Sequence, residues 1–351
     1  MVNSITVIQH RQRLLEILRA KESPVSIQLL AAELGISRIA LWKLVKKLQD
    51  LGYPIQRVQK GYFLPPERDP DLLCPWELGP FGIRTVWFRQ CGSTMQEAKR
   101  LIHAPLKKLS DQRENPLEKE SLHLQLLHPD PYYLVAETQT AGRGRFSRRW
   151  ESPAGGMYLT LILSEPIPYS IVARYPLLAC STLLETLFTL YPSLQTDRTP
   201  FPLHLKWPND IYAGNRKLAG LLVDMEIEGD TVTHLYLGMG LNVYSRNLPK
   251  KAITLAELLG KSQVSRRKIL TSYLQNLNRH FKEPFLKGAI AHWKQYSLVF
   301  GKTVKVIFPG AKKAGLAPIS GTALDLSPKG ELLVKSADGI VHSIGYGGSL
   351  V

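Results

Sequence analysis

The stretch Gln139-Thr140-Ala141-Gly142-Arg143-Gly144-Arg145-Phe146-Ser147-Arg148-Arg149-Trp150 is the most informative part of this chain of 351 residues. Its two glycines allow the backbone to approach a ligand closely and to adopt unusual dihedral angles. Its four arginines form a positive field with no acidic residue inside it. An anion with several oxygen atoms would gather the guanidinium groups and order the loop. The pattern favours a loop that binds a nucleoside phosphate, an acyl phosphate or a nucleic-acid backbone, with a solvated basic loop as the alternative.

The composition indicates a protein of two or three domains that binds polyanions. Hydrophobic residues make up 44% of the chain, enough for buried cores, and 45 basic against 29 acidic residues give a net charge of +16. Cys74, Cys91 and Cys180 are widely separated, which predicts no disulfide framework and no metal site. The amino terminus lacks a secretory pattern, and no apolar stretch is expected to reach membrane-spanning length. The expectation is a cytoplasmic protein without membrane contact.

Residues 1–65 are predicted to form a winged helix-turn-helix domain. Apolar residues at helical spacing predict helices from about Gln9, over Ile27–Leu34, and from a Ser37 cap to about Leu51, and Tyr53–Leu64 alternates like a hairpin. The basic excess of this segment fits a surface that follows DNA phosphates, although a small helical interaction or dimerisation module is the alternative. The candidate DNA-binding residues are Ser37, Arg38, Trp42 and Lys43.

Three further regions follow in an α+β multidomain architecture. Proline and glycine discourage regular structure in a linker over residues 66–84. Residues 85–300 mix alternating and helical patterns, which predicts a mixed sheet backed by helices. Residues 301–351 consist of short alternating segments between glycines, which predicts a small SH3-like β-barrel. The polar, irregular segment 103–131 is expected to be a surface insertion, and the sequence suggests no function for it.

Four polar motifs stand in the central domain beside the arginine loop. Cys91–Met95 offers two adjacent hydroxyls, and Lys206–Asp210 places a carboxylate where Mg²⁺ could be held against phosphates. Arg216–Val223 carries cations at the head of an apolar strand, and Gly238–Val243 ends a strand with Asn242. Each motif alone has an ordinary alternative, namely a helix cap, a turn, a solvated strand end and a turn cap. Together they indicate a ligand site.

In their order, these motifs resemble those of the biotin protein ligases. The amino-terminal domain, which ends in Gly61-Tyr62-Phe63-Leu64-Pro65, resembles that of the bifunctional members that also repress biotin-synthesis genes. The carboxy-terminal segment resembles the small last domain of the same proteins. The resemblance covers nearly the whole chain. It implies synthesis of biotinyl-5′-AMP from biotin and ATP, then transfer of biotin to an acceptor lysine on the biotin carboxyl carrier protein subunit of a carboxylase.

The resemblance also implies roles for individual residues. The expected biotin-binding residues are Ser93, Thr94, Gln139, Gly142, Arg143, Gly144, Arg145, Lys217 and Gly220. The expected ATP- or adenylate-binding residues are Arg145, Arg148, Trp150, Asn209, Asp210 and Asn242. The expected catalytic residues are Lys217, Arg143 and Arg148, and Asp210 is expected to hold Mg²⁺ through the phosphates. Operator DNA and a second copy of the chain, recruited by the bound ligand, are the expected macromolecular partners besides the carrier protein.

Two positions depart from the family pattern, and three alternatives stay open. Met95 occupies a position where an asparagine is expected at the biotin site, and Trp42 stands on the recognition helix in place of a small polar residue. The alternatives are a lipoate ligase, a transcription factor that senses biotin without catalysis, and a ligase whose amino-terminal domain does not bind DNA. The arginine loop and the winged helix disfavour the first, and Lys217 with the loop arginines disfavours the second.

Overall fold

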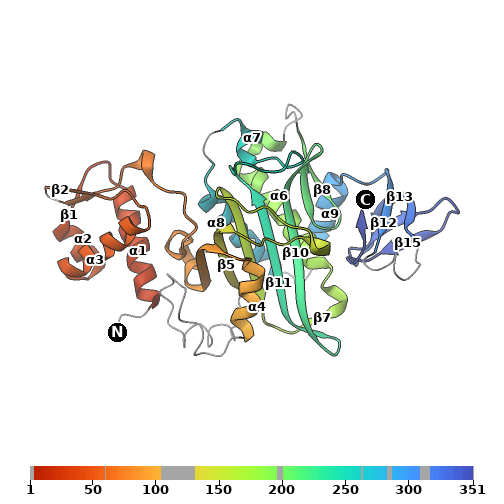
Figure 1. Cartoon of the computed structure of the whole chain (residues 1–351), viewed down its shortest axis with the longest axis horizontal. Coiled ribbons are helices and arrows are strands. Elements are labelled where there is room, and N and C mark those ends of the chain that lie inside the picture. Colours follow the sequence, from red (N-terminus) through yellow and green to blue (C-terminus); the bar gives the residue numbers. More distant parts are fainter. Residues whose placement is uncertain are drawn as a thin grey trace.

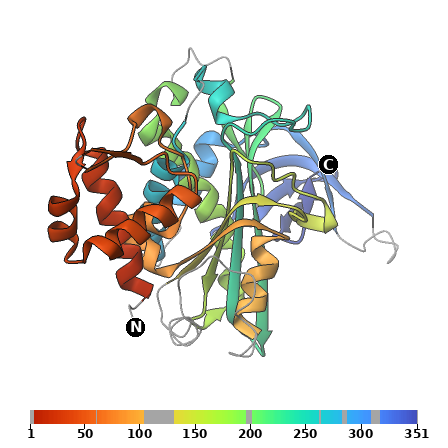
Figure 2. The same cartoon turned by 60° about the vertical axis from the view of Figure 1, so that its left-hand side comes forward.

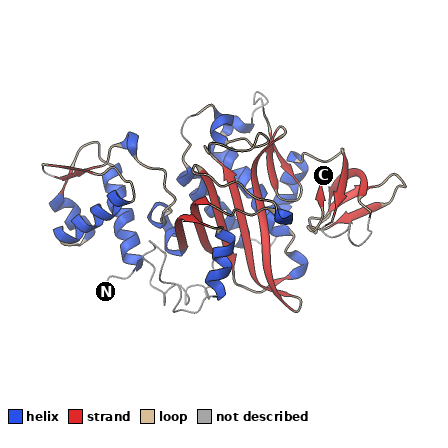
Figure 3. Ribbon diagram, viewed as in Figure 1, coloured by secondary structure: helices blue, strands red, loops and turns tan. Residues whose placement is uncertain are grey.

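The computed structural model describes residues 4–59, 61–103, 131–195, 201–261, 264–282, 287–308 and 317–350. Three units follow one another along the longest axis of the molecule: a mostly helical unit, a large sheet with helices, and a small unit of strands (Figures 1 and 3). Nearly all of the predicted insertion over residues 103–131 lies outside the described residues.

The amino-terminal unit is a winged helix-turn-helix, as predicted. Its elements are α1 (Ser4–Arg19), β1 (Val25–Ser26), α2 (Ile27–Leu34), α3 (Arg38–Asp50), β2 (Gln56–Val58) and β3 (Gly61–Phe63). The hydroxyl of Ser37 caps α3 by accepting a hydrogen bond from the amide of Ala40 at 3.2 Å. Gly35 ends α2 in the left-handed region, with φ 61°, which glycine adopts without strain. The short strand β1 pairs with β3 and adds a third strand that the sequence did not indicate.

A mixed eight-stranded sheet forms the central unit. Its order is β4-β5-β6-β11-β10-β9-β8, with β7 paired to β11, and β4 and β5 are parallel. The strands are β4 (Thr85–Cys91), β5 (Tyr132–Gln139), β6 (Gly156–Leu163), β7 (Ile167–Pro168), β8 (Leu203–Lys206), β9 (Asp210–Ala213), β10 (Arg216–Glu228) and β11 (Thr231–Asn242). The helices are α4 (Thr94–His103), α6 (Arg174–Leu190), α7 (Leu255–Leu259), α8 (Arg266–Lys282) and α9 (Lys287–Tyr296).

Helices cover both faces of this sheet. Figure 2 shows α4 on one face, and α6 and α8 on the other. By length and composition alone, Tyr169–Leu190 could cross a membrane, since it has 22 residues and contains an 18-residue window with a mean hydropathy of 1.3. This corrects the expectation that no apolar stretch reaches membrane-spanning length. Within the fold, 61% of that window is buried, because this helix packs against α8 and the sheet.

The carboxy-terminal unit is a five-stranded antiparallel sheet in the order β15-β14-β13-β12-β16. The strands are β12 (Thr303–Ile307), β13 (Ile319–Leu326), β14 (Leu332–Lys335), β15 (Val341–Ile344) and β16 (Ser349–Leu350). A closed barrel was expected, but β15 and β16 lie at opposite edges of the order and do not pair with each other in the described residues. The all-strand character is therefore confirmed, and closure is not observed.

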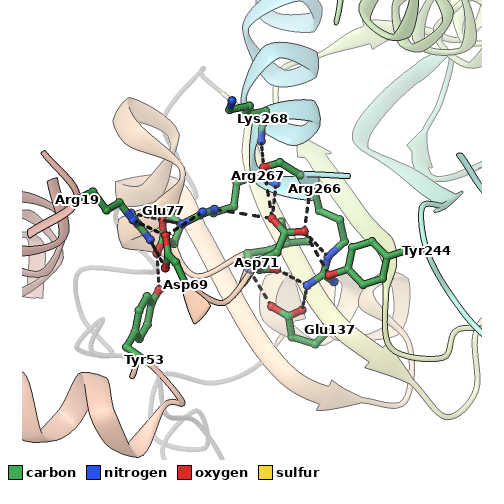
Figure 4. A network of polar contacts seen from close by, with 12 residues as sticks. Arg19, Tyr53, Asp69, Asp71, Glu77, Glu137, Tyr244, Arg266, Arg267 and Lys268 are labelled. Carbon is green, nitrogen blue, oxygen red and sulfur yellow. Dashed lines mark hydrogen bonds and ion pairs between the residues drawn. The ribbon is translucent and has the colours of Figure 1, made fainter. Parts of the chain in front are cut away.

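The segment predicted as an irregular linker contains short 3₁₀ turns and joins the first two units. Its turns are Pro66–Arg68, Pro75–Glu77 and Gly79–Arg84. The guanidinium of Arg19 in α1 lies 2.7 Å from carboxylate oxygens of both Asp69 and Glu77. From the other side, Arg267 at the start of α8 donates to Glu77 at 2.9 Å (Figure 4). The side chain of Glu77 is 2% exposed, so this carboxylate is buried between two arginines of different units.

A second part of the network reaches strand β5. Arg266 lies 2.9 Å from Glu137 and also pairs with Asp71 of the linker (Figure 4). Glu137 accepts further hydrogen bonds from the amide of Leu73 and the indole of Trp87, both at 2.9 Å. Buried charges that are fully paired hold one geometry, because breaking any pair leaves a charge without compensation. The linker therefore docks the amino-terminal domain against the central one.

Candidate functional site

One cavity of about 340 Å³ collects nearly every small-molecule residue predicted from the sequence. It receives side chains from the turn before α4, the end of β5, the arginine loop, the turn between β8 and β9, and the strands β10 and β11. The predicted residues that line it are Ser93, Thr94, Gln139, Arg143, Gly144, Arg145, Arg148, Trp150, Asn209, Asp210, Lys217, Gly220 and Asn242. These motifs are distributed over residues 93–242 of the sequence, and the sheet brings them to one place.

Gly142 is the predicted residue that does not line the cavity. A Cβ atom at this position would lie 2.4 Å from the carbonyl oxygen of Trp150 and 2.6 Å from the hydroxyl of Ser152. The carbonyl of Gly142 also accepts a hydrogen bond from the amide of Trp150 at 3.0 Å. This glycine therefore allows the two sides of the arginine loop to pack closely, which is a structural function.

A chain of hydrogen bonds forms the polar floor of the cavity. The side-chain oxygen of Gln139 accepts from the backbone amide and the hydroxyl of Thr94, at 2.7 and 3.1 Å. Its amide nitrogen donates to Ser152 at 2.9 Å, and Thr160 donates to Thr94 at 2.9 Å. Gln139, from a neighbouring strand, thereby satisfies an amide at the start of α4.

Sequence reasoning missed Ser152 and Thr160. Thr160 lies within β6, whose residues are all buried, and it is fully buried itself. A hydroxyl in an otherwise apolar buried strand needs a partner, and that was the available signal. Ser152 carried no comparable signal, because its hydrogen bonds depend on how the loop returns to the sheet.

Lys217 and Asp210 form an ion pair inside the cavity, 2.7 Å apart. Asp210 opens β9 and is paired in register with Gly220 of β10, and a register shift follows Lys217. The two side chains are 30% and 18% exposed. The resemblance implied separate roles for them, one beside the biotin carboxylate and one on the Mg²⁺ side, whereas the structure places the two side chains in direct contact.

Two glycines make room for the indole of Trp150. Gly220 and Gly240 face each other across β10 and β11. A Cβ at Gly240 would lie 2.5 Å from the indole nitrogen, and one at Gly220 would lie 3.0 Å from the indole and 2.9 Å from Cε of Lys217. The indole thus lies over a side-chain-free part of the sheet, 5.2 Å from the Lys217 ammonium.

Two polar atoms at this end of the cavity are buried and have no hydrogen-bond partner within the described chain. They are the indole nitrogen of Trp150 and the side-chain oxygen of Asn242. Asn242 is 2% exposed, and its amide nitrogen already donates to the carbonyl of Lys217 at 3.3 Å. An unsatisfied buried group costs about 1–3 kcal/mol, so a donor and an acceptor without partners on two residues that line one cavity indicate a polar ligand.

In the arginine loop, Arg145 makes contacts outside the cavity that the sequence did not indicate. Its guanidinium donates to the carbonyl oxygens of Tyr346 and Gly348, the second at 2.9 Å, and lies 4.6 Å from the Tyr346 ring. Burial lowers the pKa of Arg145 from its ordinary value. This arginine, predicted to bind biotin and adenylate, lines the cavity but also joins the loop to the carboxy-terminal sheet.

The tip of the same loop is strained. Phe146 has φ 57° and Ser147 has φ 58°, both in the left-handed region that is uncommon for residues other than glycine. Strain of this kind is found where a segment switches or clamps a ligand. Arg143 and Arg148 line the cavity beside this tip.

Two other predicted positions have defined contacts. The amide nitrogen of Asn209 donates to the carbonyl of Leu221, and its backbone carbonyl accepts from the amide of Leu221 at 2.8 Å, so Asn209 fixes the turn against β10. Met95 is 5% exposed and lines the cavity, and a Cβ at Gly238 would lie 2.9 Å from its methyl group. Met95 therefore gives an apolar wall where a polar contact was expected.

Metal binding rests on Asp210 alone among the predicted residues. Within the described ranges, no group of three or more His, Cys, Asp or Glu residues is placed to hold a metal ion. A single carboxylate in a cavity that is also lined by arginines suits Mg²⁺ that is bound mainly by substrate phosphates, because Mg²⁺ keeps several water ligands.

Of the predicted DNA-binding residues, one caps the recognition helix α3 and the other three have exposed side chains on it. Ser37 is engaged as the cap, whereas Arg38, Trp42 and Lys43 are exposed. The exposed residues lie outside the buried stripe of Leu41, Val45 and Leu48.

Comparisons with known proteins agree with this arrangement of fold and site. Residues 110–242 match the model of the biotin/lipoate A/B protein ligase family, and residues 10–63 match an HTH domain. The fold and site thus define a ligase domain of this family behind a helix-turn-helix domain. Over these two regions the chain is similar to biotin protein ligases of the form that carries an amino-terminal HTH domain.

Individual relatives extend the likeness over most of the chain. The bifunctional ligase/repressor BirA of Bacillus subtilis is 28% identical over 327 residues, which are 90% of each chain. The bifunctional ligase/repressor BirA of Escherichia coli is 27% identical over 214 residues, 59% of this chain and 62% of that one. Among solved structures, the biotin protein ligase from Aquifex aeolicus in complex with biotin and ATP has a TM-score of 0.54 at 27% identity, covering 76% of this chain and 98% of that chain.

Proposed function

We propose that this protein activates biotin with ATP and transfers it to a lysine of a biotin carboxyl carrier protein, and that it represses biotin-synthesis genes. The observation that carries the ligase proposal is the cavity in which a neutral polar floor, a lysine–aspartate pair and an arginine loop meet. A relative that is bifunctional over the same length supports both activities.

The first step joins two anions. A carboxylate oxygen of biotin attacks the α-phosphorus of ATP, the new P–O bond forms, and the bond to pyrophosphate breaks. The floor formed by Thr94 and Gln139 suits the neutral ring system of biotin, since it offers donors and acceptors without net charge. Lys217 and Arg143 lower the barrier by stabilising the charge that builds up on the phosphate oxygens. Mg²⁺, held beside Asp210, would neutralise the phosphates when bound.

The second step transfers the acyl group. The neutral amine of the acceptor lysine attacks the carbonyl carbon of the mixed anhydride, AMP leaves with the anhydride oxygen, and the amine loses a proton. The unpartnered groups of Trp150 and Asn242 suit a nucleoside, which would satisfy both. The arginine loop keeps water from the anhydride by closing over it, with Arg148 as a phosphate contact.

Several finer features belong to the same proposal. The HTH domain binds operator DNA as a dimer, because two half-sites are needed for useful selectivity, and ligand in the central cavity favours that dimer. The carboxy-terminal sheet is of the SH3-like type, in view of its five short antiparallel strands. The protein acts in the cytoplasm, where its carrier substrate and DNA are found together.

The experiment combines the purified full-length chain with ATP, Mg²⁺, a biotin carboxyl carrier domain and either biotin or lipoate. We expect pyrophosphate release and labelling of the carrier lysine with biotin alone. Labelling with lipoate instead would identify a lipoate ligase. Biotin binding without pyrophosphate release would identify a sensor, and either result would overturn the ligase proposal.

A further inference from the structure

Two large apolar side chains on the recognition helix lie outside the hydrophobic core and are exposed. Ile39 is 70% exposed and Trp42 is 52% exposed. They are three residues apart in α3, so they are neighbours on the helix surface. The interior stripe of the same helix is complete without them, since Leu41 and Leu48 are fully buried. Exposed apolar residues that are adjacent indicate a contact surface.

We propose that Ile39 and Trp42 read thymine by contacting its 5-methyl group in the major groove of DNA. The inference rests on the DNA-binding part of the proposed function and adds the base that the helix selects. Trp42 was predicted only as a DNA-binding residue that departs from the family pattern, and Ile39 was not predicted at all.

The position on the helix favours base edges over phosphates. The Ser37 cap fixes the start of α3, so Ile39 lies in the first turn and Trp42 in the second. In helix-turn-helix proteins, the amino-terminal residues of the recognition helix enter the major groove. A helix in that groove places its first turns against the bases, and these two side chains are long enough to touch them.

Charge selects DNA rather than an apolar protein partner. Arg38, Lys43, Lys46 and Lys47 are all exposed on the same helix. Lys43 follows Ile39 by four residues and Lys46 follows Trp42 by four, so each apolar residue has an ammonium group on the same helical face. An apolar protein surface would gain nothing from this field, whereas a polyanion is attracted by it.

The chemistry then identifies the base. In the major groove, thymine presents a 5-methyl group beside its O4 acceptor, whereas cytosine has only a hydrogen at that carbon and the purines present hydrogen-bonding groups. An isoleucine and an indole cannot satisfy those groups with their carbon surfaces, but they bury a methyl group well. Burial of one such group is worth about 0.8 kcal/mol, which corresponds to about fourfold in affinity.

The test begins with selection of duplexes from a random pool by the full-length protein in the presence of biotinyl-5′-AMP. Each thymine of the selected site is then replaced, one at a time, by deoxyuridine, which removes only the methyl group. We expect about fourfold weaker binding for at least one thymine in each half-site. Ile39→Ala and Trp42→Ala should each abolish the penalty at the thymine that its side chain contacts.

Leu29→Ala is the matched control, because Leu29 is an equally apolar side chain, 47% exposed, on α2 rather than α3. This variant should keep every deoxyuridine penalty. Selected sites that tolerate deoxyuridine throughout, or penalties that survive in both α3 variants, would overturn methyl readout while leaving sequence-specific binding intact. If no preferred sequence is recovered, the proposal of sequence-specific DNA binding is itself refuted. The proposed ligase activity would be unaffected, because a separate assay tests it. A change in oligomeric state of the α3 variants, with unaltered DNA affinity, would assign the patch to protein contact and also overturn the inference.

Discussion

Replacement of Lys217 by alanine should remove most adenylate synthesis while leaving the protein folded. The Lys217 ammonium lies 2.7 Å from Asp210 and 5.2 Å from the indole of Trp150, inside the cavity. No other basic group is ion-paired with Asp210 in the described residues, so the substitution leaves that carboxylate facing an incoming triphosphate.

The magnitude follows from two contributions of different size. The ion pair contributes little to folding, because its side chains are 30% and 18% exposed and such pairs are worth about 0–1 kcal/mol. Loss of a donor aimed at charge that develops in the transition state costs about 3–4 kcal/mol, or on the order of 10²–10³ in rate. We therefore expect kcat for pyrophosphate release to fall by about that factor, with a change in Tm of only a few degrees.

The assay is pyrophosphate release from ATP and biotin under single-turnover conditions, with circular dichroism to verify folding. Lys250→Ala is a suitable control, since Lys250 is exposed and lies outside the cavity lining. Asp210→Asn, alone and combined with Lys217→Ala, completes a double-mutant cycle that measures the coupling of the pair. Near wild-type turnover in Lys217→Ala would refute the assigned role, and equal losses in Lys250→Ala would show that general charge, not position, matters.

Three further outcomes are expected. Trypsin cleavage within residues 143–149 should slow when biotinyl-5′-AMP is bound, because the anion orders the arginines, and cleavage that ignores the ligand would contradict this. Glu77→Gln should loosen the docking of the amino-terminal domain and destabilise the protein by less than about 3–5 kcal/mol, the cost of a fully broken buried pair, because Arg19 and Arg267 keep Asp69 as a second shared counter-ion; linker proteolysis and chemical unfolding measure it, and unchanged resistance in both would be the contrary result. Burial, with a smaller contribution from Glu97, raises the pKa of Cys91 to about 12, so its thiol should resist alkylation at pH 8 until the protein unfolds. Rapid labelling of the folded protein at pH 8 would contradict this. Because the pKa of Cys91 is higher in the folded protein, burial of the neutral thiol stabilises the fold fully below pH 9.0, the ordinary value, and this contribution is lost as the pH rises towards 12.

Local sequence determined much of the fold. The Ser37 cap, the Gly35 stop and the stripe of Leu41, Val45 and Leu48 are set by residues within a few positions of one another, and these were predicted correctly. Lys217 at the head of β10 was recognised in the same way. The proline-rich linker was expected to lack regular structure and contains short 3₁₀ turns, but its composition did not indicate that Asp69 and Glu77 dock it between two units.

The sequence by itself also determined which residues are available to the site, since all but one of the small-molecule residues predicted from the order of its motifs line the cavity. Only the tertiary structure decided how they combine: that Lys217 pairs with Asp210, that Gly220 and Gly240 clear space for Trp150, and that Arg145 reaches the carboxy-terminal sheet. Each of these contacts depends on strand register or on the docking of separate units. Register is fixed by the burial of whole strand faces, so no local pattern encodes it.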